Sequence, residues 1–173
     1  MSAEEQPTAE DLTRSGVEAT ERADYQVAVA RYKEAVELDG TCWDAWVGWR
    51  NSLTQLDTPE PEVQAFRAKV EQDFDTASGH TLLGNVLLDL KRYPEAIEAY
   101  GTAIEKDADY APAYNGWGRA LARQKKHAEA VSRYKTATEK DKEFELAYSN
   151  WSLILAQLDT PEPEVQAFRA KVE

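Results

Sequence analysis

The sequence predicts an all-α protein built from five antiparallel helix pairs that repeat every 34 residues. Residues 55–71 and 157–173 carry the same 17-residue sequence at an offset of 102 residues, which is three times 34. Apolar residues recur at the three- and four-residue spacing of a helix face. No stretch alternates long enough to predict a strand. Because one helix pair cannot bury its apolar face alone, the pairs are expected to stack as a solenoid.

The 34-residue period also predicts the domain organisation. Counting from Ala9 divides the chain into four complete repeats and a truncated fifth, without an insertion or a gap. Residues 1–8 precede the repeats, contain two glutamates and are expected to form a flexible acidic tail. The five repeats are 9–42, 43–76, 77–110, 111–144 and 145–173.

The helices of each repeat are predicted from two apolar series and the break between them. In the third repeat the break is at 91–94, and Pro94 fits the first turn of the second helix, where a backbone N–H has no helical partner. In the second repeat the break is at 57–62, where Thr58 can cap the next helix. The apolar series of the third repeat are Leu83, Val86, Leu87 and Leu90, then Ile97, Tyr100, Ala103 and Ile104.

Small residues predict where the two helices of a pair approach closely. Gly84 and Gly118 are expected to make room for the helix that carries Ala96 or Ala130. The second repeat has Arg50 at the glycine position, so its second helix is expected to pack at a shifted angle. Two interpretations of Arg50 are open: an ion pair with Glu62 across the helix pair, or a side chain that points to solvent.

The tryptophans allow either a ligand pocket or an enlarged core. Trp49, Trp117 and Trp151 share one position in successive or near-successive repeats. Matching positions favour the core, because every repeat must fill the same space against its neighbour. Trp43 lies at a repeat boundary and is the expected exception.

The repeats resemble the tetratricopeptide repeat family, whose pattern places aromatic, Leu-Gly and Ala residues at fixed positions. The resemblance covers residues 9–173 and implies a right-handed α-solenoid that acts as a non-catalytic scaffold. The matching residues are Gly16, Ala28, Tyr32 and Ala35 in the first repeat, His80, Leu83, Gly84, Leu87, Ala96, Tyr100 and Ala103 in the third, and Tyr114, Trp117, Gly118, Leu121, Ala130, Tyr134 and Ala137 in the fourth.

Composition and motifs disfavour several classes of function. The net charge of −12 disfavours nucleic acid as a partner, and no apolar run is long enough to span a membrane. The single Cys42 excludes an intrachain disulfide, and with two histidines the chain is not expected to hold a metal. We find no phosphate-binding or dinucleotide motif, so neither a cofactor nor enzymatic activity is expected. No signal segment opens the sequence, which makes a cytoplasmic location the default expectation.

The resemblance also implies where a partner binds, because the first helix of each pair lines the concave groove in this family. A protein or peptide partner is therefore expected. An Asn at the groove offers a donor and an acceptor to a peptide backbone, although a generic polar surface is an equal alternative. Of the residues that clamp chaperone tails in relatives, only Asn51 fits, so that partner is not expected. The candidate groove residues are Asn51, Gln55, Asn85, Asn115, Arg119 and Arg123.

Charge singles out the fourth repeat. Its eight basic and four acidic residues give it a charge of +4, whereas the other repeats are negative. Arg119 and Arg123 lie one helical turn apart on the expected groove face. They predict an acidic partner segment or a C-terminal carboxylate, because arginine can hold a carboxylate through two parallel hydrogen bonds. The alternative is a merely solvated face.

A self-assembling structural protein is the rival interpretation. The copied segment 157–173 repeats an apolar stripe that suits an interior helix covered by the next repeat, yet no repeat follows it in this sequence. An uncovered apolar stripe favours association between chains. The alternative is a frayed last helix on a monomer. The residues of the stripe are Val165, Phe168 and Val172.

Overall fold

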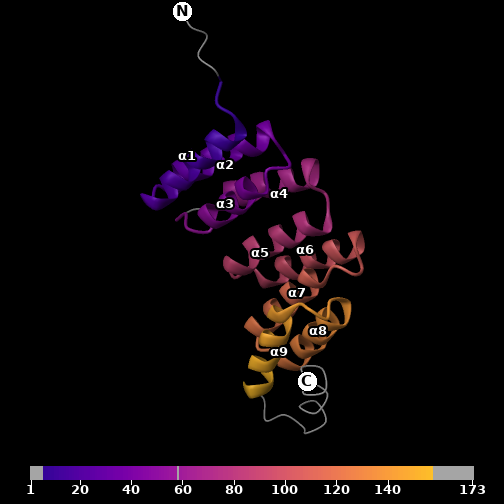
Figure 1. The fold of residues 1–173 in the computed structure, drawn as a ribbon. Coiled ribbons are helices and arrows are strands. Elements are labelled where there is room, and N and C mark those ends of the chain that lie inside the picture. The colour runs from indigo at the N-terminus through magenta and orange to yellow at the C-terminus, as the bar shows by residue number, and fades with distance from the viewer. Residues whose placement is uncertain (1–5, 58, 158–173) are drawn as a thin grey trace, which may run out of the picture. The chain divides into compact units, whose positions relative to one another are not determined.

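The computed structural model describes residues 6–57 and 59–157, and these residues form nine α-helices and no strand (Figure 1). The fold is an all-α helical repeat solenoid, as the sequence predicts. The tenth helix, expected within 158–173, lies outside the described residues. The helices are α1 (Ala9–Glu21), α2 (Tyr25–Leu38), α3 (Trp43–Leu53), α4 (Glu60–Asp73), α5 (Ala77–Asp89), α6 (Tyr93–Lys106), α7 (Ala111–Arg123), α8 (His127–Lys140) and α9 (Glu145–Gln157).

The chain divides into two compact units, which we call unit 1 (Met1–Asp75) and unit 2 (Thr76–Glu173). Within the described part of the chain, none of the helices is both long and apolar enough to cross a membrane. The same residues contain no group of three or more His, Cys, Asp or Glu side chains placed to hold a metal ion.

Tight turns join the two helices in the first, third and fourth repeats, and a longer loop joins them in the second. Ala23, Lys91 and Lys125 each adopt a positive φ of 58° to 62° in these tight turns. In the second repeat α3 ends at Leu53 and α4 begins only at Glu60, after Pro59 in the capping position. The capping expected from Thr58 lies outside the described residues. The missing tight turn gives α3 and α4 more freedom in how they pair.

Tyrosine rings inserted between glycines hold the regular repeats together. Tyr100 of α6 lies between Gly84 of α5 and Gly116 of α7, and a Cβ added at either glycine would come within 2.5 or 2.4 Å of the ring. The glycines were expected to make room for alanines on the second helix. They instead make room for a tyrosine ring. The ring comes from the second helix of the pair and fills the gap between that helix and two successive first helices.

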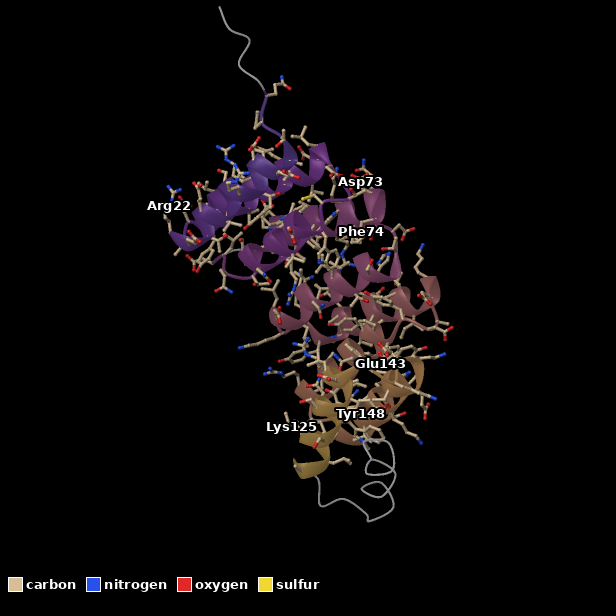
Figure 2. All side chains as sticks on the ribbon, in the orientation of Figure 1. Arg22, Asp73, Phe74, Lys125, Glu143 and Tyr148 are labelled. Atoms are coloured by element: carbon tan, nitrogen blue, oxygen red, sulfur yellow. The ribbon has the colours of Figure 1, made fainter. Side chains whose placement is uncertain are left out.

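The second repeat replaces this arrangement by an aromatic cluster within unit 1. Phe66 of α4 takes the tyrosine position, and its ring centroid lies 5.4 Å from that of Trp46 and 4.9 Å from that of Trp49. Phe74, which is labelled in Figure 2, stacks on Trp46 at 5.3 Å. With Arg50 at the glycine position, a closely inserted ring is excluded. The two large indoles fill the wider space between α3 and α4.

Tryptophan burial supports the enlarged core over a ligand pocket. The side chains of Trp49 and Trp151 are 2% and 1% exposed, whereas Trp43 is 48% exposed at its repeat boundary. Trp117 is half-buried, and the guanidinium of Arg133 lies 3.9 Å above its ring centroid. A cation over an aromatic face is an attractive arrangement, so this indole is covered by the protein itself.

Glu62 pairs with a different partner from the one proposed for it. Its carboxylate accepts a hydrogen bond from the Lys33 ammonium of α2 at 3.3 Å. The pair therefore connects α4 to the preceding repeat, and the ion pair with Arg50 across the α3–α4 pair, one of the two open interpretations, is wrong. The long lysine reaches Glu62 because α2 and α4 are neighbouring second helices in the stack.

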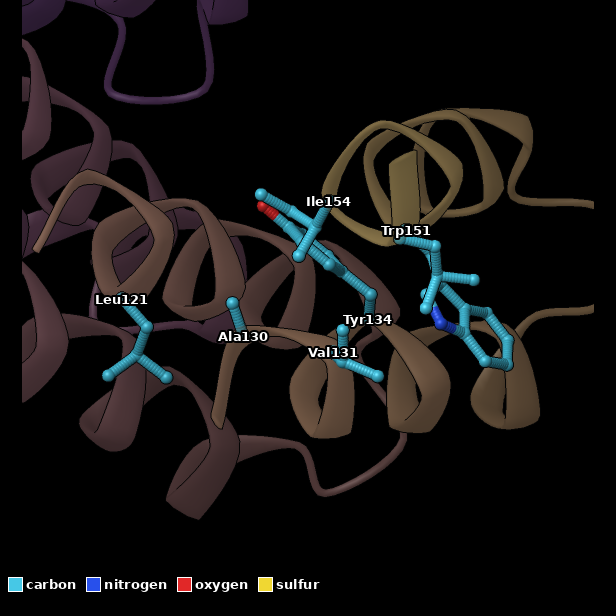
Figure 3. Packing of buried hydrophobic residues seen from close by; sticks show 7 residues of the cluster. Leu121, Ala130, Val131, Tyr134, Trp151 and Ile154 are labelled. Atoms are coloured by element: carbon cyan, nitrogen blue, oxygen red, sulfur yellow. The ribbon is translucent and has the colours of Figure 1, made fainter. Parts of the chain in front are cut away.

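A buried apolar cluster in unit 2 positions α9 against α7 and α8. Trp151 and Ile154 of α9 pack with Leu121 of α7 and with Val131 and Tyr134 of α8. Figure 3 shows the hydroxyl end of Tyr134 next to Ile154. The cluster fixes the face of α9 that turns toward the arginines of α7.

Candidate functional site

The arginines predicted from the sequence line a cleft in unit 2, which we call the arginine cleft. It has a volume of about 310 Å³ and is formed by three helices, α7, α8 and α9. Its floor and walls combine charged, polar and apolar side chains. The lining residues are Arg119, Ala122, Arg123, Tyr134, Asn150, Leu153 and Ile154.

The two arginines give the cleft its charge. Arg119 is half-buried and Arg123 is exposed, and they lie four residues apart on α7. Neither has a carboxylate within ion-pair distance among the residues that the structure describes. Like charges at this spacing repel and slightly destabilise a helix. The cleft therefore holds two cations that the described part of the protein does not neutralise.

Tyr134 adds a hydrogen-bond donor beside the arginines. Burial raises the pKa of the Tyr134 hydroxyl to about 12, although the positive charges of Arg119 and Arg123 act in the opposite direction. The hydroxyl is consequently protonated near neutral pH and can donate to a carboxylate or a carbonyl oxygen. The three side chains line the same cleft.

An amide pair orients the polar wall of the cleft. The Nδ2 of Asn150 on α9 donates to the Oδ1 of Asn115 on α7 at 2.9 Å. Asn115 is buried, with 4% of its side chain exposed, whereas Asn150 lines the cleft. Because the bond engages the amide nitrogen of Asn150, its Oδ1 is available as an acceptor. Asn115 thus acts beneath the cleft and positions Asn150.

Apolar side chains of α9 also line the cleft. Leu153 is 59% exposed, and Ile154 beside it is buried in the cluster under the cleft. An exposed leucine beside two arginines offers apolar contact and charge to the same ligand. The cleft thus presents apolar surface and positive charge together.

The remaining predicted groove residues do not line the arginine cleft. Asn85 is half-buried on α5, and its Oδ1 accepts a hydrogen bond from the Tyr100 hydroxyl at 2.9 Å. Asn51 is exposed in unit 1 and accepts from Arg50 at 3.2 Å. Gln55 lines a different cleft of about 510 Å³ between the α1–α2 turn and the α3–α4 loop. The structure brings Arg119 and Arg123 together and places Asn115 beneath them.

The candidate groove residues did not include Ala122, Tyr134, Asn150 or Ile154, which also line the cleft. Asn150 carried a usable signal, because it lies 34 residues after Gly116 and 102 after Gly48. The same position holds Arg14 and Leu82 in other repeats, so only the comparison with the two glycines that face a tyrosine ring marks Asn150 as a special contact. The proposed self-association stripe, Val165, Phe168 and Val172, lies outside the described residues and stays a prediction.

Comparison with known proteins finds a matching family model and solved structures of similar fold. A family model described as TPR repeat matches residues 84–125. The crystal structure of MamA is similar with a TM-score of 0.63 and 19% identity, covering 95% of this chain and 90% of that one. YrrB, a TPR protein with an unusual peptide-binding site, is similar with a TM-score of 0.56 and 21% identity, over 94% and 84% of the chains.

A third similar structure is PilF of Pseudomonas aeruginosa, with a TM-score of 0.65 and 19% identity, covering 94% of this chain and 72% of that one. No curated protein sequence matches the chain. Repeats of this kind generally serve as non-catalytic scaffolds for protein–protein interaction. Residues 84–125 are thus similar to a TPR repeat, and the helix pairs share the fold of these solved structures.

Proposed function

We propose that this protein is a non-catalytic scaffold that binds an acidic peptide segment or a C-terminal carboxylate in the arginine cleft. One observation carries the proposal: Arg119 and Arg123 lie side by side without a carboxylate partner among the described residues, in a chain with a net charge of −12. A cleft that keeps two cations close together favours an anionic ligand, because the ligand relieves their repulsion.

Each part of the cleft has a distinct task in this proposal. Arg119 and Arg123 hold the carboxylate, and the protonated Tyr134 hydroxyl donates a further hydrogen bond to it. The Oδ1 of Asn150 accepts a backbone N–H of the peptide. Leu153 contacts an apolar side chain of the ligand. The combination selects a segment that carries charge and apolar surface at adjacent positions.

The asparagines predicted to hold a peptide backbone take modified roles. The Oδ1 of Asn85 is engaged by Tyr100, so its amide nitrogen is left to donate to a peptide carbonyl. Asn115 acts indirectly by orienting Asn150. Asn51 and Gln55 belong to unit 1 and do not line this cleft. The similar YrrB has an unusual peptide-binding site, which supports a peptide site outside the chaperone-tail pattern.

A peptide library tests the proposal directly. The full chain is presented with random octapeptides in two arms, one with free C-terminal carboxylates and one with amidated ends. We expect enrichment of peptides with a terminal carboxylate or an Asp or Glu side chain next to an apolar residue. Enrichment of basic peptides, or no difference from an unrelated acidic protein, would contradict the proposal.

Self-assembly through the repeat ends is the second candidate function. It is favoured by the first occurrence of the copied segment, in which Val63, Phe66 and Val70 are all fully buried. The same side chains recur at Val165, Phe168 and Val172. A Phe168→Glu variant should therefore lower the mass measured by light scattering at high concentration. Identical masses for the variant and the native chain would remove this candidate.

A further inference from the structure

Two leucines are the most exposed large apolar side chains among the described residues. Leu38, at the end of α2, is 60% exposed, and Leu153 in the arginine cleft is 59% exposed. They belong to different units, since Leu38 lies in unit 1 and Leu153 in unit 2. Burying two such leucine side chains against one another is favourable.

The surroundings of the two leucines carry opposite charge. Glu37 precedes Leu38, is exposed and has no ion pair within the described ranges. Leu153 instead shares its cleft with Arg119 and Arg123. The same difference extends over longer stretches: the first two repeats each have a charge of −4, and the repeat that carries the arginines has +4. The two surfaces are therefore both apolar and opposite in charge.

We propose that the Glu37–Leu38 segment of one copy docks in the arginine cleft of a second copy. Leu38 packs on Leu153, and the Glu37 carboxylate is held by Arg119 and Arg123. This proposal rests on the proposed function, because it names a second copy of this chain as an occupant of the same cleft. The contact is heterologous, since it joins two different surfaces. Copies linked in this way form an open chain or a closed ring.

The position of Glu37 makes it a suitable residue to change. It lies in the last turn of α2, where a basic side chain complements the helix dipole better than an acidic one. A Glu37→Arg substitution is therefore expected to leave the fold intact while reversing the docking charge. Adding Arg119→Glu and Arg123→Glu to the same chain makes the cleft negative. The attraction between the docking segment and the cleft is then restored, with the sign of both surfaces reversed.

The test measures the sedimentation of the full chain over a range of concentrations. Native protein should self-associate reversibly, and either Glu37→Arg alone or the arginine reversal alone should weaken this by about tenfold or more. The triple variant should recover association to within about threefold of the native value. Glu105→Arg, an exposed change of equal charge on α6, serves as the control and should leave association unchanged.

The outcomes separate this inference from the proposed function. If the library yields acidic peptides but the native chain remains monomeric at every concentration, the self-docking inference is wrong and the proposed function stands. Association that survives both single reversals, or a triple variant that does not recover, overturns the inference as well. A selected peptide that binds the cleft should also dissociate the assembly, and failure to compete would place the self-contact elsewhere.

Discussion

Reversing both arginines of the cleft, Arg119→Glu with Arg123→Glu, is expected to weaken binding of a selected acidic peptide by on the order of 2 kcal/mol or more, which is roughly thirtyfold. The reason is geometric as well as electrostatic. Both guanidiniums line one cleft, so a carboxylate that enters it meets two charges at once. After the reversal the same carboxylate is repelled by both side chains.

The binding measurement needs a control for net charge. Lys126→Glu with Lys135→Glu makes the same change of charge in the same repeat, at two exposed positions that do not line the cleft. Isothermal titration at two salt concentrations should show a large loss for the arginine variant and a small one for the lysine control. Affinity of the native chain should also fall as salt rises, since exposed charges are screened. Equal losses in both variants would mean that general charge, rather than the cleft, attracts the peptide.

The largest expected effect on stability concerns the glycines beside the inserted tyrosines. Gly116→Ala should destabilise the fold by about 2 kcal/mol, because the new Cβ would meet the Tyr100 ring at 2.4 Å. The ring has no room to retreat, since Gly84 closes its other side and the tyrosine is fully buried. The overpacking outweighs the helix propensity that alanine gains over glycine.

A matched glycine should respond with the opposite sign. Gly101 lies within α6, and a Cβ added there would meet nothing within 4 Å. Gly101→Ala should therefore stabilise the fold by about 0.5–1 kcal/mol through helix propensity alone. Denaturant titrations of both variants give the comparison. In a Tyr100→Ala background the penalty of Gly116→Ala should disappear, and a penalty that persists would show that the ring is not its cause.

Much of the architecture could be predicted from the sequence because it is periodic. The 34-residue offset placed the helix pairs, and apolar spacing within each repeat showed which helix faces turn inward. The burial of Trp49 and Trp151 followed from their matching repeat positions. The proximity of Arg119 to Arg123 could also be predicted from the sequence, because residues four apart on one helix are neighbours whatever the helix packs against.

The contacts that only the tertiary structure decided are those between helices that are distant in sequence. Tyr100 is enclosed by glycines 16 residues on either side of it, and neither glycine shares its helix. Asn115 turns inward to orient Asn150, 35 residues later, because α7 and α9 are neighbouring first helices. Periodicity tells which residues are equivalent, but it does not tell which equivalent residues touch. Which residues touch depends on how closely the helices approach. The volumes of the side chains packed between the helices set that distance.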